Sequence, residues 1–273
     1  MSATGGDQVE VDLAPPIVEP FDPDQAAIDA TKAPLLDHLI ELRRRLLWSL
    51  AALGSAFFGC LYIAKPIFGF LVQPLLAAGQ NRLIYTQLFE AFFVEVKVAL
   101  FGAFMIAFPV IATQIWRFIA PGLYTKEKRA VLPFLLATPV LFTAGAAAAY
   151  YVAIPIALKF LLGFQGDIGG VQQEAMPAVG NYLDFVMHFM LAFGIAALLP
   201  ILLMLLERAG IVTLEQLASV RRYMIVAAFG VAAVATPPDI VSMLLLAVPL
   251  VLLYEIALIA IRITRRRRAQ TEA

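Results

Sequence analysis

Long apolar runs constrain this chain more than any other feature of its sequence. The hydrocarbon core of a bilayer is ~30 Å thick, so a helix that crosses it needs about 20 consecutive apolar residues. Runs of about this length cover residues 46–64, 92–116, 131–154, 182–206 and 223–261. Hydrophobic residues make up 62% of the 273, and the mean hydropathy is +0.86. A soluble domain of this size cannot bury so much apolar surface, so lipid must be the solvent for most of the chain.

The last run is interrupted by "TPPD" at residues 236–239. A proline ends a helix and an aspartate can cap the next one, so this stretch predicts a tight turn between two spans. We therefore expect six transmembrane helices in all. The fifth, residues 223–235, is about 20 Å long at ~1.5 Å per residue, so it either thins the membrane or does not fully cross it.

Prolines inside the spans predict bent helices. Each removes a backbone donor, which lipid tolerates only where neighbouring groups satisfy the freed carbonyl. Several bends in one bundle favour a concave shape over straight walls. The expected fold is an all-α polytopic membrane protein with a kinked, concave bundle; the prolines are Pro109, Pro139, Pro155, Pro200 and Pro249.

The distribution of basic residues predicts the orientation of the chain. Loops that stay in the cytoplasm are enriched in Lys and Arg. Sixteen of the twenty basic residues fall on one side of the predicted spans, together with both termini. The other four lie on the opposite side or in the second span: Lys65, Arg82, Lys97 and Lys159. Both termini are therefore expected in the cytoplasm.

The two ends of the chain differ from the apolar middle. Residues 1–33 carry seven acidic side chains and four prolines, which predicts a disordered acidic tail. Residues 263–273 include the run Arg265 to Arg268 and are expected to form a basic tail. The membrane domain is expected to cover residues 34–262.

The motifs of common enzyme classes are missing from the sequence. It contains no Gly-rich phosphate loop, no HExxH and no CxxC, and its only histidines are His38 and His188. The single cysteine, Cys60, excludes an internal disulfide and lies within an apolar run. We expect no enzymatic activity, no cofactor and no metal site.

Two carboxylates lie among basic residues on the predicted cytoplasmic side. In "APLLDHLIELRRRLL" (33–47), Pro34 suits a first helical turn, and Glu41 precedes Arg45 by one turn. Such an intrahelical pair contributes ~0.3–0.5 kcal/mol and is the simplest interpretation of Glu41. Glu127, in "FIAPGLYTKEKR" (118–129), is similarly explained by charge balance within its loop.

Three stretches together resemble a known family. "HLIELRRRL" (38–46), "FIAPGLYTKEKR" (118–129) and "TPPD" (236–239), in this order on a six-span chain, are similar to TatC, the core receptor subunit of the twin-arginine protein translocase. The resemblance covers residues 34–262 and extends to "QIWRFIAP" and "FVMHFMLAFG". It implies a protein of the bacterial cytoplasmic (inner) membrane that binds signal peptides carrying two consecutive arginines on folded proteins. It also implies single-span partners, TatA and TatB, self-association in a complex, no nucleic acid, and export driven by the protonmotive force.

The resemblance assigns roles to particular residues. Glu41 and Glu127 match the acids that bind the two arginines, and a guanidinium can bind a carboxylate through two parallel hydrogen bonds where a lysine cannot. Four further residues match positions around this site: Arg43, Gln114, Phe118 and Pro121. Structural or partner-docking positions are Lys97, Pro237, Pro238, Asp239 and Met243. For Asp239, capping of the sixth span is an equally good interpretation.

The chain departs from the family pattern at two positions. Leu198 stands where many relatives carry a glutamate two residues before a proline, and Met243 stands where some carry a glutamine. Both changes make the inner face of the bundle more apolar. They argue against any mechanism that needs a buried carboxylate in the fourth span, and against a polar docking patch on the sixth.

Two other functions fit a polytopic membrane protein. A proton-coupled secondary transporter of a small solute would be expected to show internal repeats and acids near the midplane, and the sequence has no repeat. A passive assembly scaffold would leave Glu41 and Glu127 as ordinary loop charges.

Lys97 needs a partner that the sequence does not identify, and His188 is expected to be a hydrogen-bonded residue within the bundle.

Overall fold

The computed structural model describes residues 23–123, 128–236 and 238–271. The chain divides into two units, Met1–Arg43 and Arg44–Ala273. Helix α1, Pro23–Tyr62, begins in the first unit and continues into the second. It begins at Pro23, well before Pro34, where the sequence suggests the first helical turn.

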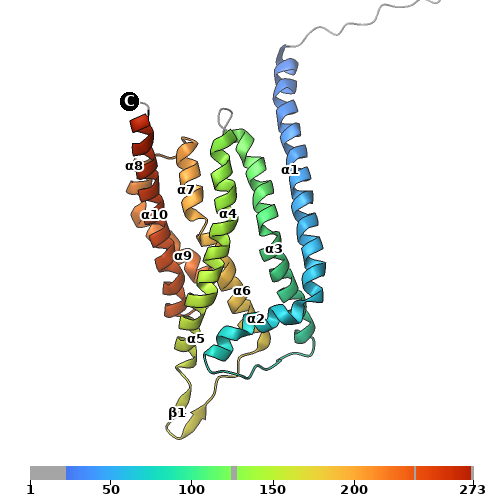
Figure 1. Cartoon of the computed structure of the whole chain (residues 1–273), viewed down its shortest axis with the longest axis vertical. Coiled ribbons are helices and arrows are strands. Elements are labelled where there is room, and N and C mark those ends of the chain that lie inside the picture. The colour runs from blue at the N-terminus through green and yellow to red at the C-terminus, as the bar shows by residue number, and fades with distance from the viewer. Residues whose placement is uncertain (1–22, 124–127, 237, 272–273) are drawn as a thin grey trace, which may run out of the picture. The chain divides into compact units, whose positions relative to one another are not determined.

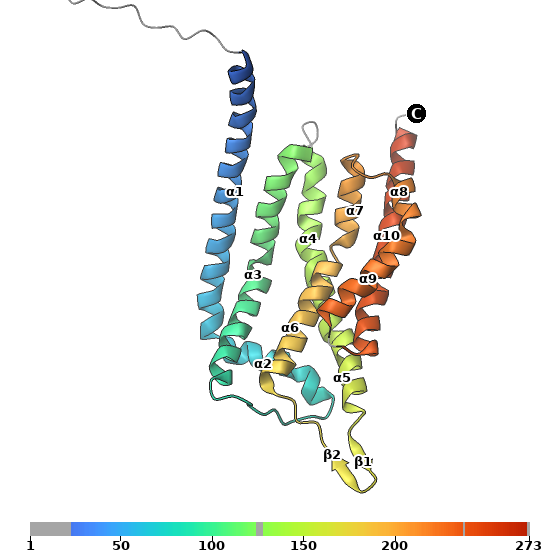
Figure 2. The same cartoon turned by 180° about the vertical axis from the view of Figure 1, so that it is seen from behind.

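The second unit is built almost entirely of helices (Figures 1 and 2). After α1 these are α2 Ala64–Ala77, α3 Glu90–Leu123, α4 Lys128–Ala148, the π-helical turn η1 Ala149–Ala153, α5 Ile154–Leu162, α6 Val179–Ala196, α7 Leu199–Arg208, α8 Leu214–Ser219, α9 Arg221–Ala235 and α10 Ile240–Thr271. Among the described residues, five helical segments are long and apolar enough to cross a membrane: His38–Tyr62, Glu90–Phe118, Phe134–Leu162, Val179–Arg208 and Ile240–Arg265. Helix α9, with 15 residues, corresponds to the short fifth span that the sequence predicts. The six-span architecture is confirmed.

Two of the spans are composite helices shaped by prolines. The third span continues from α4 through η1 into α5, with Pro155 in the first turn of α5 directly after the π-helical turn. A π-helical turn before a proline lets the helix absorb the lost hydrogen bond without breaking. The fourth span does break, at Ala197 and Leu198, and α7 restarts with Pro200 in its first turn.

Close packing of α4 against α6 forms the centre of the second unit. A Cβ atom added to Gly145 would lie 2.5 Å from the carbonyl oxygen of Phe193, and one on Gly194 would lie 2.7 Å from the ring of Phe142. Phe142 is fully buried and stacks on Phe108 of α3, with ring centroids 3.7 Å apart. Small residues therefore bring the two backbones together and let one aromatic pair tie α3 to α4.

Two elements were not expected from the sequence. Helix α2 lies across the ends of the spans (Figure 2), burying Leu71 and Leu75 while Phe70 stays exposed. Strands β1, Gly166–Ile168, and β2, Val171–Gln173, form a small antiparallel hairpin, which is an exception to the all-α prediction. Its turn residues Gly169 and Gly170 have φ of 65° and 86°, the left-handed region that a two-residue hairpin turn requires.

The loop before α3 is fastened to the segment before α6. Ile84 forms a parallel β-bridge with Ala178, and the Gln80 side chain donates to the carbonyl of Ala175. Glu90 Oε1 accepts a hydrogen bond from the backbone N–H of Gly180 at 2.7 Å. These contacts hold the starts of α3 and α6 together at the end of the unit where α2 lies.

Helices α3, α7 and α10 end at the opposite end of the unit, and α4 begins there (Figure 1). We call this the basic end because of the arginines that these helices carry. Basic side chains on these helices are Arg117, Arg208, Arg262 and Arg265. Arg265 of α10 pairs with Glu207 at 3.2 Å and with Glu215 of α8 at 3.0 Å. The pKa of Glu215 is lowered by its own backbone N–H, by the Thr213 hydroxyl and by Arg265. The basic end is thus the end that the sequence assigns to the cytoplasm.

Candidate functional site

A polar contact at the basic end links α1 to α3. Arg45 of α1 donates from Nη1 to Gln114 Oε1 of α3 at 3.3 Å, and both residues are half-buried. Arg45 belongs to the unit Arg44–Ala273, as Gln114 does. The sequence suggested only an intrahelical partner for Arg45, and the structure adds this contact 69 residues away.

An aromatic stack holds together the helix ends that flank residues 124–127. Trp116 Nε1–H donates to Thr138 Oγ1 at 2.7 Å, and Trp116 stacks on Phe134 with ring centroids 6.0 Å apart. The guanidinium of Arg208, on α7, lies 4.9 Å from the centroid of the Phe134 ring. A cation over an aromatic face is attracted by the ring quadrupole. The stack therefore ties α3, α4 and α7 together at the basic end.

The residues expected to bind a signal peptide fall into three groups. Gln114 and Phe118 are half-buried and one turn apart on α3, so they share a helix face. Pro121 lies in the same helix but its side chain is outside the described part, as is Glu127 altogether. Glu41 and Arg43 lie on α1 in the first unit. The meeting of Glu41 with Glu127 stays a prediction.

An ion pair lies within the spans. Lys97 Nζ of α3 is 2.8 Å from Oδ2 and 2.9 Å from Oδ1 of Asp184 on α6. His188, one turn further along α6, has Nδ1 2.6 Å from the carbonyl oxygen of Asp184. Because a carbonyl only accepts, Nδ1 carries a proton, and in the neutral ring Nε2 is an acceptor. His188 is thus hydrogen-bonded, as expected, and it also faces a groove.

That groove has a volume of about 490 Å³ and is otherwise apolar, lined by residues such as Leu100, Phe104 and Leu191. Sequence analysis missed Asp184 as the partner of Lys97, although an acid inside an apolar span was a signal for it. The side chains of Lys97 and Asp184 are 50% and 37% exposed, so the pair remains accessible from the groove.

The turn between α9 and α10 contains a side chain that caps a helix and buried polar atoms without a hydrogen-bond partner among the described residues. Asp239 Oδ1 accepts from the backbone N–H of Ser242 at 2.7 Å, which is the predicted cap of the last span. The other carboxylate oxygen of Asp239 and the hydroxyl of Ser242 are buried without a partner among the described residues. Pro238 is exposed, Met243 is half-buried against the core, and Pro237 is outside the described residues.

Leu198 lies among aromatic side chains. It packs in the cluster formed by Phe108, Ala112 and Phe142. A carboxylate there would face aromatic rings, so the substitution is consistent with an apolar wall at this depth. The fourth span does carry acids at other positions, among them Asp184 on the Lys97 groove.

Six apolar spans and a basic end define a polytopic helical membrane protein. The family model described as "Sec-independent protein translocase protein (TatC)" matches residues 37–249, and the chain belongs to this family. It is 46% identical to the Sec-independent protein translocase protein TatC of Magnetococcus marinus over 244 residues, which cover 89% of each chain. It is 43% identical to that of Aquifex aeolicus, over 88% of this chain and 99% of the relative.

Solved structures agree with this family. A crystal structure titled as the twin arginine translocase receptor TatC is similar with a TM-score of 0.73 and 44% identity. The similarity covers 83% of this chain and 98% of that one. The resemblance inferred from the sequence is confirmed, and the chain is an integral membrane component of a protein translocase.

Proposed function

We propose that this protein is the core receptor subunit of a twin-arginine translocase, binding signal peptides with two consecutive arginines at its basic end. The observation that carries the proposal is the family match over residues 37–249, which includes both Glu41 and Glu127. The Arg45–Gln114 contact supports it, because it joins α1 to α3 close in sequence to both acids.

The proposed recognition rests on paired charge-assisted hydrogen bonds. Each guanidinium of the signal would be bound by one carboxylate, Glu41 or Glu127, in a planar two-bond arrangement. Gln114 and Phe118 would flank this site from α3, with Arg43 and Pro121 completing it. The Trp116 stack would keep the ends of α3 and α4 in place, so that little conformational entropy is lost when the signal peptide binds.

We further propose that the basic end lies in the cytoplasm of a bacterial inner membrane, with both termini on that side. The segregation of Lys and Arg supports this orientation. The energy for export would come from the protonmotive force, as the resemblance to the family implies, and the sequence is consistent with this because it contains no nucleotide-binding motif.

Single-span subunits of the TatA and TatB type are the proposed partners, and self-association would complete the complex. The turn at Asp239 is the proposed docking region, with Pro237, Pro238 and Met243 around it. Two observations support this region. Helix α9 is short, and Pro238, next to Asp239 in the turn, is exposed.

A crosslinking experiment tests signal binding. Full-length protein in membranes is exposed to a photo-crosslinkable Arg-Arg signal peptide, with Glu127→Ala compared to wild type. The matched control is Glu174→Ala, an exposed acid near the hairpin at the opposite end. We expect crosslinking and export of a folded reporter to be lost only in Glu127→Ala, with both variants inserted to normal levels. Undiminished crosslinking in Glu127→Ala would refute the role of this acid.

The Lys97 groove favours a second candidate function, a proton-coupled carrier of a small solute. An ion pair and an imidazole on a groove within the spans are features of such carriers. Proteoliposomes distinguish the two functions. A carrier would move protons in response to a solute gradient without any signal peptide, whereas a receptor would not.

A further inference from the structure

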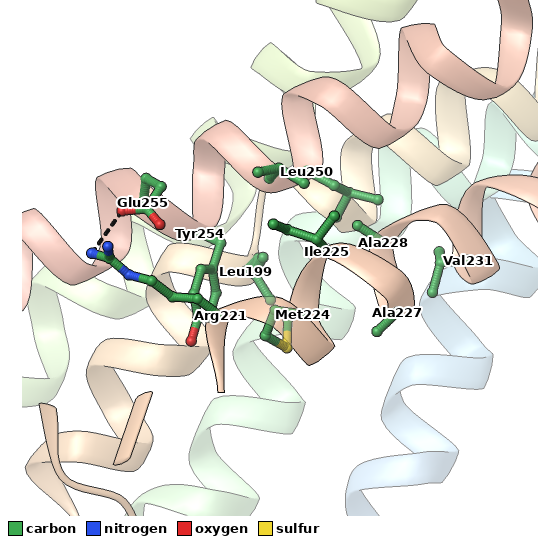
Figure 3. A pocket seen from close by; sticks show the side chains of 11 residues that line it. Leu199, Arg221, Met224, Ile225, Ala227, Ala228, Val231, Leu250, Tyr254 and Glu255 are labelled. Atoms are coloured by element: carbon green, nitrogen blue, oxygen red, sulfur yellow. Dashed lines mark ion pairs between the residues drawn. The ribbon is translucent and has the colours of Figure 1, made fainter. Parts of the chain in front are cut away.

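The slot between α9 and α10 has a charged mouth at the end where α9 begins (Figure 3). We propose that this α9–α10 slot binds an anionic phospholipid, with one acyl chain in the slot and the phosphate on Arg221 and Arg222. The site is separate from the proposed signal-peptide site and from the turn at Asp239, so it stands independently of the proposed function.

The slot is narrow and apolar. Its volume is about 130 Å³, and its walls come from α7, α9 and α10, including Leu199, Met224, Ala228 and Leu250. Ala227 and Ala228 leave the space into which a chain of methylene groups fits. An apolar slot of this volume suits a single acyl chain.

The mouth of the slot has an excess of positive charge. Arg221 Nη2 lies 3.0 Å from Glu255 Oε2, and these side chains are 46% and 38% exposed (Figure 3). The next residue, Arg222, donates to the hydroxyl of Tyr223 and lies over its ring at 4.8 Å. The one carboxylate is paired with Arg221, and Arg222 follows directly in the sequence; each guanidinium keeps N–H donors for a phosphate.

Two further features strengthen the positive field. The start of α9 has no side-chain cap, so its first N–H groups add the positive end of the helix dipole. Arg262 follows Glu255 by seven residues, which puts it on the same face of α10, two turns nearer the basic end. A zwitterionic headgroup would bring its own cation into this field, so an anionic headgroup is favoured.

The mouth lies within the helical segment Ile240–Arg265 that is long enough to span a membrane. Glu255 precedes Arg265 by ten residues, about 15 Å along the helix at ~1.5 Å per residue. Arginines at such a depth extend their guanidiniums toward the interface while the side-chain stem stays in apolar surroundings. An acyl chain gains no hydrophobic free energy by entering the slot, because it is already surrounded by hydrocarbon in the membrane. The slot therefore only positions the lipid, and the interaction with the headgroup determines which lipid binds.

Photo-labelling of the full-length protein in nanodiscs tests the proposal. The discs contain phosphatidylcholine with a small fraction of either phosphatidylglycerol or phosphatidylcholine bearing the same photoreactive acyl chain. Labelled peptides are located by mass spectrometry. Since one basic residue near the surface is worth ≈ 1 kcal/mol for an anionic lipid, we expect about five-fold more labelling of α9 and α10 by phosphatidylglycerol, and about a five-fold loss in Arg222→Gln.

A second variant tests the slot without touching the charges. Ala227→Leu, at an exposed position lining the slot, should reduce labelling by either lipid. Val234→Leu, an exposed residue of the same helix outside the slot, should leave it unchanged. Equal labelling by the two lipids in wild type would overturn the proposal, because it would indicate ordinary surrounding lipid. Displacement of the lipid by inorganic phosphate, or protein–protein crosslinks in place of lipid labelling, would overturn it as well.

Discussion

Lys97 on α3 and Asp184 on α6 form an ion pair with both carboxylate oxygens within 2.9 Å of the ammonium, although the residues are 87 apart in sequence. It joins two spans and lies on the groove that His188 also faces. The contribution of this pair to the stability of the protein depends on how well each charge is compensated by the other.

Removing only one partner of this pair should destabilise the protein. Asp184→Asn leaves the ammonium without its counter-charge, and we expect a loss of about 1–2 kcal/mol, since the pair is only partly buried. The double variant Lys97→Met with Asp184→Leu should be closer to wild type, because no uncompensated charge remains. Thermal unfolding of detergent-solubilised protein measures this. Glu95→Gln, at an exposed position on the same helix, is the control.

Signal peptides should discriminate between arginine and lysine. A Lys-Lys signal loses the two-bond geometry of the guanidiniums, so its affinity should fall by at least ~1 kcal/mol, about five-fold. Fluorescence anisotropy with labelled peptides and protein in nanodiscs measures the two affinities. In Glu41→Gln and Glu127→Gln the difference between the signals should shrink. Equal binding of both signals to wild type would contradict the proposed recognition.

The Trp116 hydrogen bond should contribute to stability at the basic end. Trp116→Phe keeps an aromatic ring over Phe134 but removes the donor to Thr138, and we expect a loss of about 1 kcal/mol. Thr138→Val removes the same bond from the other side. Because the two variants share one interaction, their effects should be less than additive in chemical or thermal unfolding. Full additivity would show that the bond contributes nothing.

Close approach of α4 and α6 should make Gly145 intolerant of any side chain. In Gly145→Ala the new Cβ would overlap the backbone carbonyl of Phe193, which cannot move aside as a flexible side chain can. Overpacking of this kind costs about 1–3 kcal/mol, so we expect a lower melting temperature and lower yield. Gly230→Ala on α9, with no atom within 4 Å of the added carbon, is the matched control.

The sequence anticipated the spans well and the extra elements poorly. The apolar runs correspond to the spanning helices, "TPPD" corresponds to the turn before α10, and the basic clusters correspond to the basic end. Helix α2 was missed because its 14 residues are too few to span a membrane. The third span was expected to end near residue 154 and extends to Leu162, because η1 carries the helix past Pro155.

For the site, sequence reasoning found residues but not contacts. Gln114 was chosen by resemblance, whereas its partner Arg45 was assigned only to its own helix. Asp239 was given two interpretations, and the hydrogen bond from the backbone N–H of Ser242 supports the capping interpretation.

The sequence by itself determined the number of spans, their order, their expected orientation and the family. Hydropathy and charge act on each segment separately, through its own transfer into lipid, so they can be evaluated without knowing the neighbours of that segment. Only the tertiary structure decided that Lys97 pairs with Asp184, that Trp116 bonds to Thr138 and that Arg221 pairs with Glu255. Those pairings depend on which helix faces meet, and helix faces meet according to side-chain volumes such as those at Gly145 and Phe142, which are distributed over the whole bundle.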